Sequence, residues 1–377
     1  MTNMIRLTSV LYSDNIYLTR VNKLRNEVGM ETVSRMTLEE IAKEIGISRT
    51  TIYKVINNKG YVSEETSRIV NEALKKYNYV ENRNARNLAM NKQYTIGYVG
   101  FKSKSANYFT TEIGKGLKRA VKEFGDDGLT LLISEFDVEK PEEQLAAVEE
   151  MLSQGVKDFV LAYSRTETIQ KILELLRKAE ARVVLLSRDY PEDEDCYYVG
   201  VDYYKSGRLA AELMGKIIPK GSIYIPVTEE YKTNTDILAR LQGFMDKMEE
   251  YQDITLLPIA YGLIEEDAIV DAIRKSIDKE EGLAGIFDLT YRLDVIAKVL
   301  GEKNRKDIKL VGFDLFEEIR GYVEDSSIDA VVYQDLSYQA YRAVKILFNE
   351  MCYDKRKDER KHYAKLEIIM KENIQYF

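Results

Sequence analysis

The sequence predicts a small all-α head followed by a larger α/β body of two lobes, each a parallel sheet with helices on both faces. Residues 37–79 contain three short segments with helical periodicity, each preceded by a residue that can cap a helix. Residues 94–377 alternate continuous apolar runs with amphipathic stretches, which is typical of buried parallel strands joined by helices. About 280 residues exceed one open sheet of ordinary size, so two lobes are expected.

The charge is divided at the same boundary. Residues 37–93 carry ten basic and seven acidic side chains, whereas residues 94–377 carry 40 basic and 53 acidic ones, in a chain whose net charge is −8. A basic head on an acidic body is the distribution expected of a nucleic-acid-binding module joined to a different domain. The acidic total therefore does not exclude DNA as a partner.

The composition excludes several kinds of chemistry. The chain has 377 residues, one histidine and two cysteines. A single histidine excludes most Ser–His–Asp and Cys–His catalysis, and every metal site that needs several imidazoles. Cys196 and Cys352 give no disulfide framework and are typical of a reducing compartment. Because the N-terminus lacks an export signal and no run of about 18 apolar residues occurs, a cytoplasmic protein without membrane contact is expected.

The head is expected to form a helix-turn-helix. Thr37 and Glu40 have the spacing of a capping box, and Gly46 ends the first helix and turns the chain. Ser48 then caps a second helix, and Ser63 caps a third. The apolar side chains expected to face inward on these two helices are Ile52, Val55, Ile56, Ile69, Val70, Ala73, Leu74 and Tyr77. Two helices joined by a tight turn and closed by a third define this motif.

The outward side of the second helix carries hydrogen-bonding and basic side chains. They are Arg49, Thr50, Tyr53, Lys54 and Asn57. The first residues of such a helix reach base edges in the major groove, and cations further along contact phosphates. An ordinary solvated helix face is the alternative interpretation of the same pattern.

The segment at residues 81–93 is polar and basic, and Leu88 is its bulkiest apolar side chain. It has too little apolar surface to fold alone. A segment that becomes helical only on DNA would need cations such as Arg83 and Arg86 for phosphates, and a leucine to wedge into a minor-groove step. We therefore expect a hinge helix or linker here.

Three motifs are specific in order and spacing. They are T-L-x-x-I-A-x-x-x-G-I-S at residues 37–48, V-S-x-x-T at residues 62–66 and Y-x-x-N-x-x-A-x-x-L-A at residues 79–89. With them, residues 36–373 resemble the lactose-repressor (LacI/GalR) family of bacterial transcription regulators. The resemblance implies that Arg49 and Thr50 read bases of a near-palindromic double-stranded operator, and that Leu88 enters the minor groove at its centre. The implied DNA contacts are Ser48, Arg49, Thr50, Thr51, Tyr53, Lys54, Asn57, Tyr61, Asn82, Arg83, Arg86 and Leu88.

The body resembles the effector-binding core of that family, which is similar to periplasmic sugar-binding proteins. The implied effector contacts are Tyr108, Phe109, Arg188, Arg240, Asp314 and Gln334. Aromatic faces can cover a sugar ring while Arg, Asp and Gln side chains bind neighbouring hydroxyls, so a sugar or polyol is the expected effector. Tyr108 and Phe109 are also compatible with ordinary core packing, and Arg240 with an ion pair at the rim.

Three positions depart from the family pattern. Ser187 replaces the usual acid before Arg188, Tyr203 stands where an asparagine is common, and Tyr291 stands where an aspartate is common. We therefore expect a ligand other than a typical hexose. A pocket lined by tyrosines suits a ligand with more apolar surface.

The expected organisation has four parts. Residues 1–35 are a disordered extension or precede the true start, 36–80 form the headpiece, 81–93 the hinge, and 94–377 the effector-binding and dimerisation core. Lobe 1 is expected at about 94–197 and 326–350, and lobe 2 at about 198–325 and 351–377. Tetrameric members of the resembled family carry an extra C-terminal leucine-rich helix. This sequence ends at KENIQYF without one, so a homodimer is expected.

The expected function is that of a homodimeric, ligand-responsive DNA-binding regulator that represses transcription. The main alternative is a solute-binding protein for transport or sensing, which would need an export signal and no headpiece. An α/β enzyme is a third possibility. No nucleophile–base pair, metal cluster or nucleotide loop is recognisable, so neither an enzyme nor a bound cofactor is expected. Activation instead of repression, and control by a phosphoprotein partner, stay open.

Overall fold

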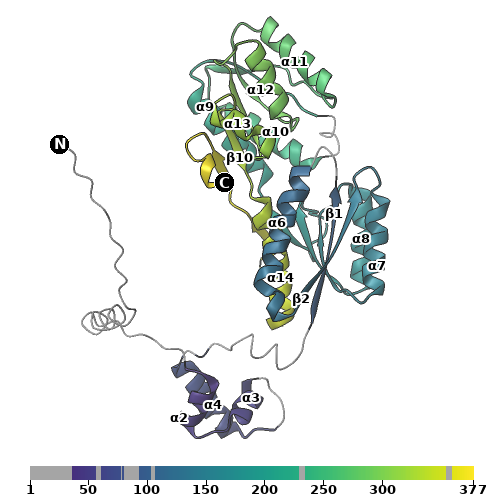
Figure 1. Cartoon of the computed structure of the whole chain (residues 1–377), viewed down its shortest axis with the longest axis vertical. Helices are drawn as coiled ribbons and strands as arrows, with labels where there is room; N and C mark the ends of the chain where they lie inside the picture. The colour runs from purple at the N-terminus through teal and green to yellow at the C-terminus, as the bar shows by residue number, and fades with distance from the viewer. Residues whose placement is uncertain are drawn as a thin grey trace, which may run out of the picture. The chain divides into compact units, whose positions relative to one another are not determined.

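The computed structural model describes residues 36–56, 61–77, 79, 93–102, 107–228, 234–353 and 359–377. The chain divides into two compact units, Met1–Arg86 and Asn87–Phe377. The first contains the helical headpiece and the second contains the α/β core (Figure 1).

The headpiece consists of three helices, α2 (Leu38–Ile45), α3 (Arg49–Ile56) and α4 (Glu64–Lys76). Thr37 and Glu40 form the expected capping box, in which the Glu40 amide donates to Thr37 Oγ1 and the Thr37 amide donates to Glu40 Oε2 at 2.7 Å. Gly46 follows in the left-handed region with φ of 67°, a conformation that costs glycine little. Ser48 and Ser63 accept from the amides of Thr51 and Thr66 at 3.1 and 3.2 Å. The predicted helix-turn-helix is confirmed.

The headpiece core is formed by Ile41, Ile52, Val70 and Ala73, which are all buried. The prediction that Ile69 faces inward is wrong, because this side chain is 37 % exposed. Successive residues of a helix are about 100° apart, so a stripe centred on Val70 and Ala73 leaves Ile69 on its flank.

Lobe 1 of the core is built on a six-stranded parallel sheet in the order β11-β5-β4-β3-β1-β2. Its strands are β1 (Tyr94–Lys102), β2 (Leu129–Asp137), β3 (Asp158–Leu161), β4 (Arg182–Ser187), β5 (Tyr197–Gly200) and β11 (Lys361–Tyr363). Helices α6 (Asn107–Phe124) and α14 (Leu336–Tyr353) pack together on one face. Helices α7 (Glu142–Ser153) and α8 (Thr166–Lys178) cover the other face (Figure 1). The short helix η1 (Gly125–Asp127) precedes β2.

Lobe 2 repeats this arrangement in the order β12-β10-β9-β8-β6-β7, with only β12 antiparallel to its neighbour. Its strands are β6 (Gly221–Tyr224), β7 (Ile254–Leu256), β8 (Leu283–Phe287), β9 (Lys309–Phe313), β10 (Ala330–Tyr333) and β12 (Glu367–Ile369). Helices α9 (Tyr203–Ile217) and α10 (Thr235–Met248) cover one face. Helices α11 (Glu266–Lys279), α12 (Leu293–Glu302) and α13 (Glu317–Glu324) cover the other, and η3 (Ile374–Tyr376) follows β12. The predicted two-lobed α/β body is confirmed.

The chain crosses between the lobes three times, after β5, after β10 and after β11. These crossings differ from the predicted lobe boundaries. Residues 326–350 were assigned to lobe 1, but β10 pairs with β9 of lobe 2 and only α14 packs on lobe 1. Likewise β5 and β11 belong to the lobe 1 sheet. A buried apolar strand has the same sequence pattern in either sheet, so its partner is decided by tertiary pairing.

Among the described residues, no helix combines the length and the apolar composition that a membrane crossing requires.

Candidate DNA-binding surface and effector cleft

The outer side of α3 carries side chains that are predicted to contact DNA. Arg49, Thr50 and Lys54 are exposed, and Tyr61, just after the helix-turn-helix, is 95 % exposed. The first turn of α3 carries no acidic residue, so the positive end of its dipole is compatible with a phosphate. None of these side chains belongs to the headpiece core.

Two residues predicted to contact DNA also stabilise α3 itself. The Ser48 and Thr51 hydroxyl oxygens lie 2.8 Å apart, and Ser48 Oγ accepts the Thr51 amide. Ser48 is therefore the cap of α3, as predicted from sequence. The other predicted contacts Asn57, Asn82, Arg83, Arg86 and Leu88 lie outside the residues that the structure describes.

Three of the predicted effector residues directly follow the carboxyl ends of parallel strands. Arg188 follows β4 of lobe 1, whereas Asp314 and Gln334 follow β9 and β10 of lobe 2. In α/β sheets this edge is where ligands bind. The ring centroids of Tyr108, at the start of α6 in lobe 1, and Phe316, after β9 in lobe 2, are 5.9 Å apart. The two edges therefore meet between the lobes, and we refer to this meeting region as the interlobe cleft.

Arg240 of α10 is deeply buried in this cleft, with 2 % of its surface exposed. Its guanidinium carbon lies 3.9 Å from the Phe313 ring centroid and 4.8 Å from that of Tyr203. Nη1 donates to the Tyr291 hydroxyl at 3.2 Å, and Nε has no hydrogen-bond partner among the described residues. No described carboxylate forms an ion pair with Arg240, in contrast to the alternative of a rim ion pair. A buried cation with an unsatisfied donor points to a missing acceptor.

Asp314 and Gln334 form the acceptor side of the cleft. Gln334 Nε2 donates to both carboxylate oxygens of Asp314, at 3.0 and 2.9 Å, whereas Gln334 Oε1 is buried without a partner in the described structure. Burial raises the pKa of Asp314, and the nearby Arg240 and Gln334 oppose that rise. The pair thus offers a fixed carboxylate and a free amide oxygen to hydroxyl donors.

The two predicted aromatic residues have different surroundings. Phe109 stacks on Phe101 with ring centroids 4.8 Å apart and an interplanar angle of 10°, and both rings pack on the lobe 1 core. This contact agrees with ordinary core packing of Phe109. Tyr108 instead faces lobe 2 through Phe316, and burial raises the pKa of its hydroxyl, so it stays protonated.

Arg188 is held by groups of the protein itself. Its Nε donates to Asp236 Oδ2 of α10 at 2.9 Å, and its Nη1 donates to the Ser164 carbonyl oxygen at 3.0 Å. Burial lowers the pKa of the guanidinium, but Asp236 more than offsets this, so the pKa lies above its ordinary value.

Two cleft tyrosines stand at the positions that depart from the resembled pattern. The Tyr203 hydroxyl donates to the Ser187 carbonyl oxygen at 2.6 Å, and burial raises its pKa well above the ordinary value. Tyr291 is 38 % exposed and accepts from Arg240. Sequence reasoning identified both positions, but it missed Asp236, which belongs to no recognisable motif.

Four non-glycine residues with left-handed backbone lie at this same edge. They are Ser187, Tyr291, Asp314 and Asp335, with φ of 65°, 60°, 64° and 46°. Ser187 is the last residue of β4, and the other three residues follow the ends of β8, β9 and β10. Such conformations cost roughly 1–3 kcal/mol each and cluster where function requires them. The strained backbone is therefore concentrated where the strands of both lobes end.

Asp288 supports the turn that carries Tyr291. Its carboxylate accepts from the Thr290 amide and hydroxyl at 2.7 and 2.6 Å, and from the Arg292 amide at 3.2 Å. Asp288 is 2 % exposed, and burial raises its pKa to about 6 despite these hydrogen bonds. Asp288 therefore stabilises the turn that presents Tyr291 to Arg240.

A helix-turn-helix headpiece on a two-lobed, cleft-bearing core defines a DNA-binding regulator whose core binds a small molecule. Residues 37–82 match the bacterial regulatory proteins of the lacI family, and residues 96–355 match the periplasmic binding protein domain. The chain belongs to the lacI family of transcriptional regulators and is a DNA-binding repressor with a ligand-binding core. Members of this family are not enzymes.

Two relatives match most of the chain. The sucrose operon repressor of Lactococcus lactis subsp. lactis is 27 % identical over 76 % of this chain and 85 % of its own length. The transcriptional repressor PurR of Pasteurella multocida is 26 % identical over 86 % of this chain and 94 % of its own. Among solved structures, a periplasmic solute-binding protein of Actinobacillus succinogenes with bound D-allose superposes with a TM-score of 0.66. It is 18 % identical and matches 76 % of this chain and 100 % of its own, which shows the fold.

Proposed function

We propose that the core binds a neutral polyhydroxylated molecule, a sugar or a polyol, between its lobes, and that this binding controls the affinity of the headpiece for its operator. One observation carries the proposal. In the described part of the chain, Arg240 Nε and Gln334 Oε1 are buried without partners, and both residues interact with the Asp314 carboxylate, Gln334 through hydrogen bonds from Nε2 and Arg240 electrostatically. A hydroxylated ligand supplies the acceptor and the donors that these groups lack.

The charges of the cleft favour a neutral ligand. Arg240 and Asp314 influence each other electrostatically without an ion pair between them, and Arg188 is already paired with Asp236. The cationic and anionic groups therefore balance, and an ionised ligand would leave one of them uncompensated. Neighbouring hydroxyls can instead bridge a guanidinium and a carboxylate.

The relatives support the same class of ligand. Their names include a sucrose operon repressor and ribose operon repressors, and the structural neighbour above contains D-allose. The tyrosines at positions 203 and 291 add aromatic surface that can pack against the carbon face of a ring. We propose a ligand with more apolar surface than a typical hexose.

A thermal-shift screen of sugars, polyols and nucleosides on the full chain tests the proposal. A cognate ligand at 100 times its Kd stabilises the core by about 2.7 kcal/mol and raises its Tm. Asp314→Asn should abolish that rise, whereas Asp307→Asn, which changes an exposed ion pair, should retain it. An unchanged Tm across the whole panel, or a full rise with Asp314→Asn, would contradict the proposal.

For the headpiece, we propose that Arg49 and Thr50 read bases while Lys54 and Tyr61 position α3 against phosphates. Arg49→Ala should weaken binding to the operator and relax its sequence preference, by about 1–3 kcal/mol for a bidentate contact. Lys54→Ala should weaken binding to all sequences and reduce the salt dependence. Fluorescence anisotropy on the upstream region of its own gene measures both, and Lys43→Ala on α2 is the control. Equal losses for specific and random DNA with Arg49→Ala would contradict base reading.

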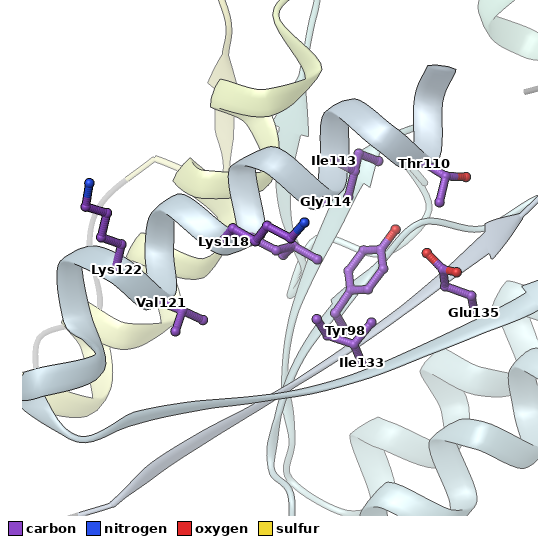
Figure 2. Close-up of a pocket in the computed structure, with 10 residues that line it drawn as sticks. Tyr98, Thr110, Ile113, Gly114, Lys118, Val121, Lys122, Ile133 and Glu135 are labelled. Atoms are coloured by element: carbon purple, nitrogen blue, oxygen red, sulfur yellow. The ribbon is translucent and has the colours of Figure 1, made fainter. Parts of the chain in front are cut away.

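We also propose that the repressor is a homodimer that associates through an edge of lobe 1. β2 is the outer strand of its sheet and exposes Ile133 at 55 %, and α6 exposes Val121 at 42 %. Between them lies a hollow of about 390 Å³ (Figure 2). Figure 2 shows Lys118 on its α6 side and Glu135 on its β2 side. A second copy of the chain can cover this unpaired edge strand and its apolar side chains. Across a twofold axis, Lys118 of one copy can pair with Glu135 of the other.

Sedimentation velocity tests this assembly. Ile133→Asp should convert the dimer to a monomer, whereas Leu238→Asp, at a similarly exposed apolar position on α10, should leave it unchanged. A monomeric wild type, or an Ile133→Asp variant that stays dimeric, would refute the proposed interface.

A further inference from the structure

We propose that Arg188 and Asp236 act as an interlobe clasp, an ion pair that holds the two lobes of the core closed without an effector. Arg188 is then a positioning residue for lobe closure, and its role does not depend on which ligand the cleft binds.

The ion pair joins elements of different lobes. Arg188 follows β4 of lobe 1, and Asp236 lies in the first turn of α10 in lobe 2. Nε and Oδ2 are 2.9 Å apart, and the two side chains are only 19 % and 15 % exposed. Partial burial limits screening by water, so this pair contributes more than an ordinary surface ion pair.

Arg188 is fixed on its own lobe before it meets Asp236. Nη1 donates to the Ser164 carbonyl oxygen, and the guanidinium carbon lies 5.6 Å from the ring centroid of Tyr163. A guanidinium oriented by two groups of lobe 1 loses less conformational freedom when it pairs across the cleft. Arg188, the lobe 1 half of the clasp, is therefore already oriented before it pairs with Asp236.

A second interlobe contact is made by Ser187, the residue before Arg188. The Tyr203 hydroxyl of lobe 2 donates to the carbonyl oxygen of Ser187, whose own hydroxyl donates to Gln339 Oε1 on α14. Ser187 has the left-handed φ of 65°, so the turn presents its carbonyl to Tyr203 and the next side chain to Asp236. Two adjacent residues of one strained turn thus carry two contacts between lobes.

Asp189, the residue after Arg188, fastens the turn to lobe 1 at the start of β11. Asp189 accepts two hydrogen bonds from Arg360, at 2.8 and 3.2 Å, and forms an ion pair with Lys361 at 2.9 Å. Arg360 also donates to the carbonyl oxygens of Tyr190 and Asp193. The turn cannot follow Asp236 if lobe 2 moves away, because these bonds hold it on lobe 1. Opening must therefore break the Arg188–Asp236 pair.

Pulsed electron–electron distance measurements on the full-length, ligand-free protein test the clasp. Spin labels at Lys171→Cys on α8 and Lys275→Cys on α11 report the separation of the lobes, since both positions are exposed. Arg188→Gln and Asp236→Asn should each shift the closed-to-open ratio by about 5- to 30-fold, giving a longer and broader distance distribution. Arg274→Gln, which removes the ion pair with Glu302 inside lobe 2, should leave the distribution unchanged.

The charge-exchanged variant Arg188→Asp/Asp236→Arg provides the rescue. It should bring the distance distribution back toward that of the wild type, although the bond to Ser164 is lost. Loss of folding in one single variant leaves the other single variant and the exchange as tests, with circular dichroism to verify folding. Wild-type distances in Arg188→Gln and Asp236→Asn, or no recovery on exchange, would overturn the proposal. So would an Arg188→Gln variant that keeps the closed distance but loses ligand binding, because Arg188 would then be an effector contact.

Discussion

Helices α9 and α10 touch through two glycines, and replacing one of them tests how the cleft is built. A Cβ added to Gly207 of α9 would lie 1.9 Å from the Arg240 carbonyl oxygen, and one added to Gly243 would lie 2.0 Å from the Tyr204 carbonyl oxygen. Both obstacles are backbone atoms, which cannot rotate away. Gly207→Ala therefore has to push α10, and Arg240 with it, by about 1 Å to restore van der Waals contact.

Two opposing effects set the expected size of the change. Alanine improves helix propensity by about 1 kcal/mol over glycine, whereas overpacking of a close contact costs about 1–3 kcal/mol. Because the obstacle is a whole helix, we expect a net loss of about 2 kcal/mol in Gly207→Ala, which lowers Tm by roughly 4–8 °C. Displacement of Arg240 should also weaken effector binding by about tenfold or more, since a hydrogen bond to a charged group contributes about 1.5–3 kcal/mol.

Calorimetry of Gly207→Ala beside Gly321→Ala is the decisive assay. Gly321 lies within α13, and a Cβ added there meets no atom within 4 Å, so only helix propensity acts and its Tm should rise. The two variants make the same chemical change with opposite expected signs. If Gly207→Ala raised Tm as Gly321→Ala does, the close helix contact beneath the cleft would be refuted.

Three further predictions concern single side chains. Burial raises the pKa of Asp288 to about 6 in the folded protein, against an ordinary 3.8. The contribution of Asp288 to the free energy of unfolding is therefore greatest below pH 4 and is lost as the pH rises through 6. Between pH 4 and 7, the free energy of unfolding of the wild type should therefore fall by up to about 3 kcal/mol relative to that of Asp288→Asn. Parallel curves of Tm against pH for the two proteins would contradict this. Ser63→Ala removes the cap of α4 and should lower headpiece stability by about 1 kcal/mol, seen as faster amide exchange in that helix. Arg240→Met should raise the Tm of the ligand-free core, because it removes a buried cation whose Nε has no partner among the described residues. The same variant should abolish the ligand-induced rise in Tm. A lower Tm in the ligand-free core would show that burial of this guanidinium is not destabilising.

Local rules were sufficient to predict most elements of the fold. The Thr37–Glu40 capping box, the glycine at position 46 and the apolar periodicity act within a few residues, so the headpiece helices follow from sequence. The alternation of buried strands and amphipathic helices likewise predicted a two-lobed α/β body. Ile69 was misplaced because a helix stripe is broader in sequence than the core that it contacts.

The candidate effector site was only partly predictable. Arg240, Asp314 and Gln334 stand in recognisable motifs, and the structure brings them into one cleft. The partner of Arg188 could not be predicted, because Asp236 lies 48 residues away on another lobe and carries no motif. Tyr203 was noted as a departure, but its bond to Ser187 depends on a left-handed turn that no residue type demands.

By itself, the sequence determined the helix-turn-helix, the two-lobed body and the chemical character of the cleft residues. These depend on caps, periodicity and side-chain type, all of which are local properties. Only the tertiary structure decided which sheet holds β5, β10 and β11, which buried polar atoms lack partners and which ion pair spans the lobes. Pairing and burial depend on distances between segments far apart in the chain, and neither composition nor spacing encodes those distances.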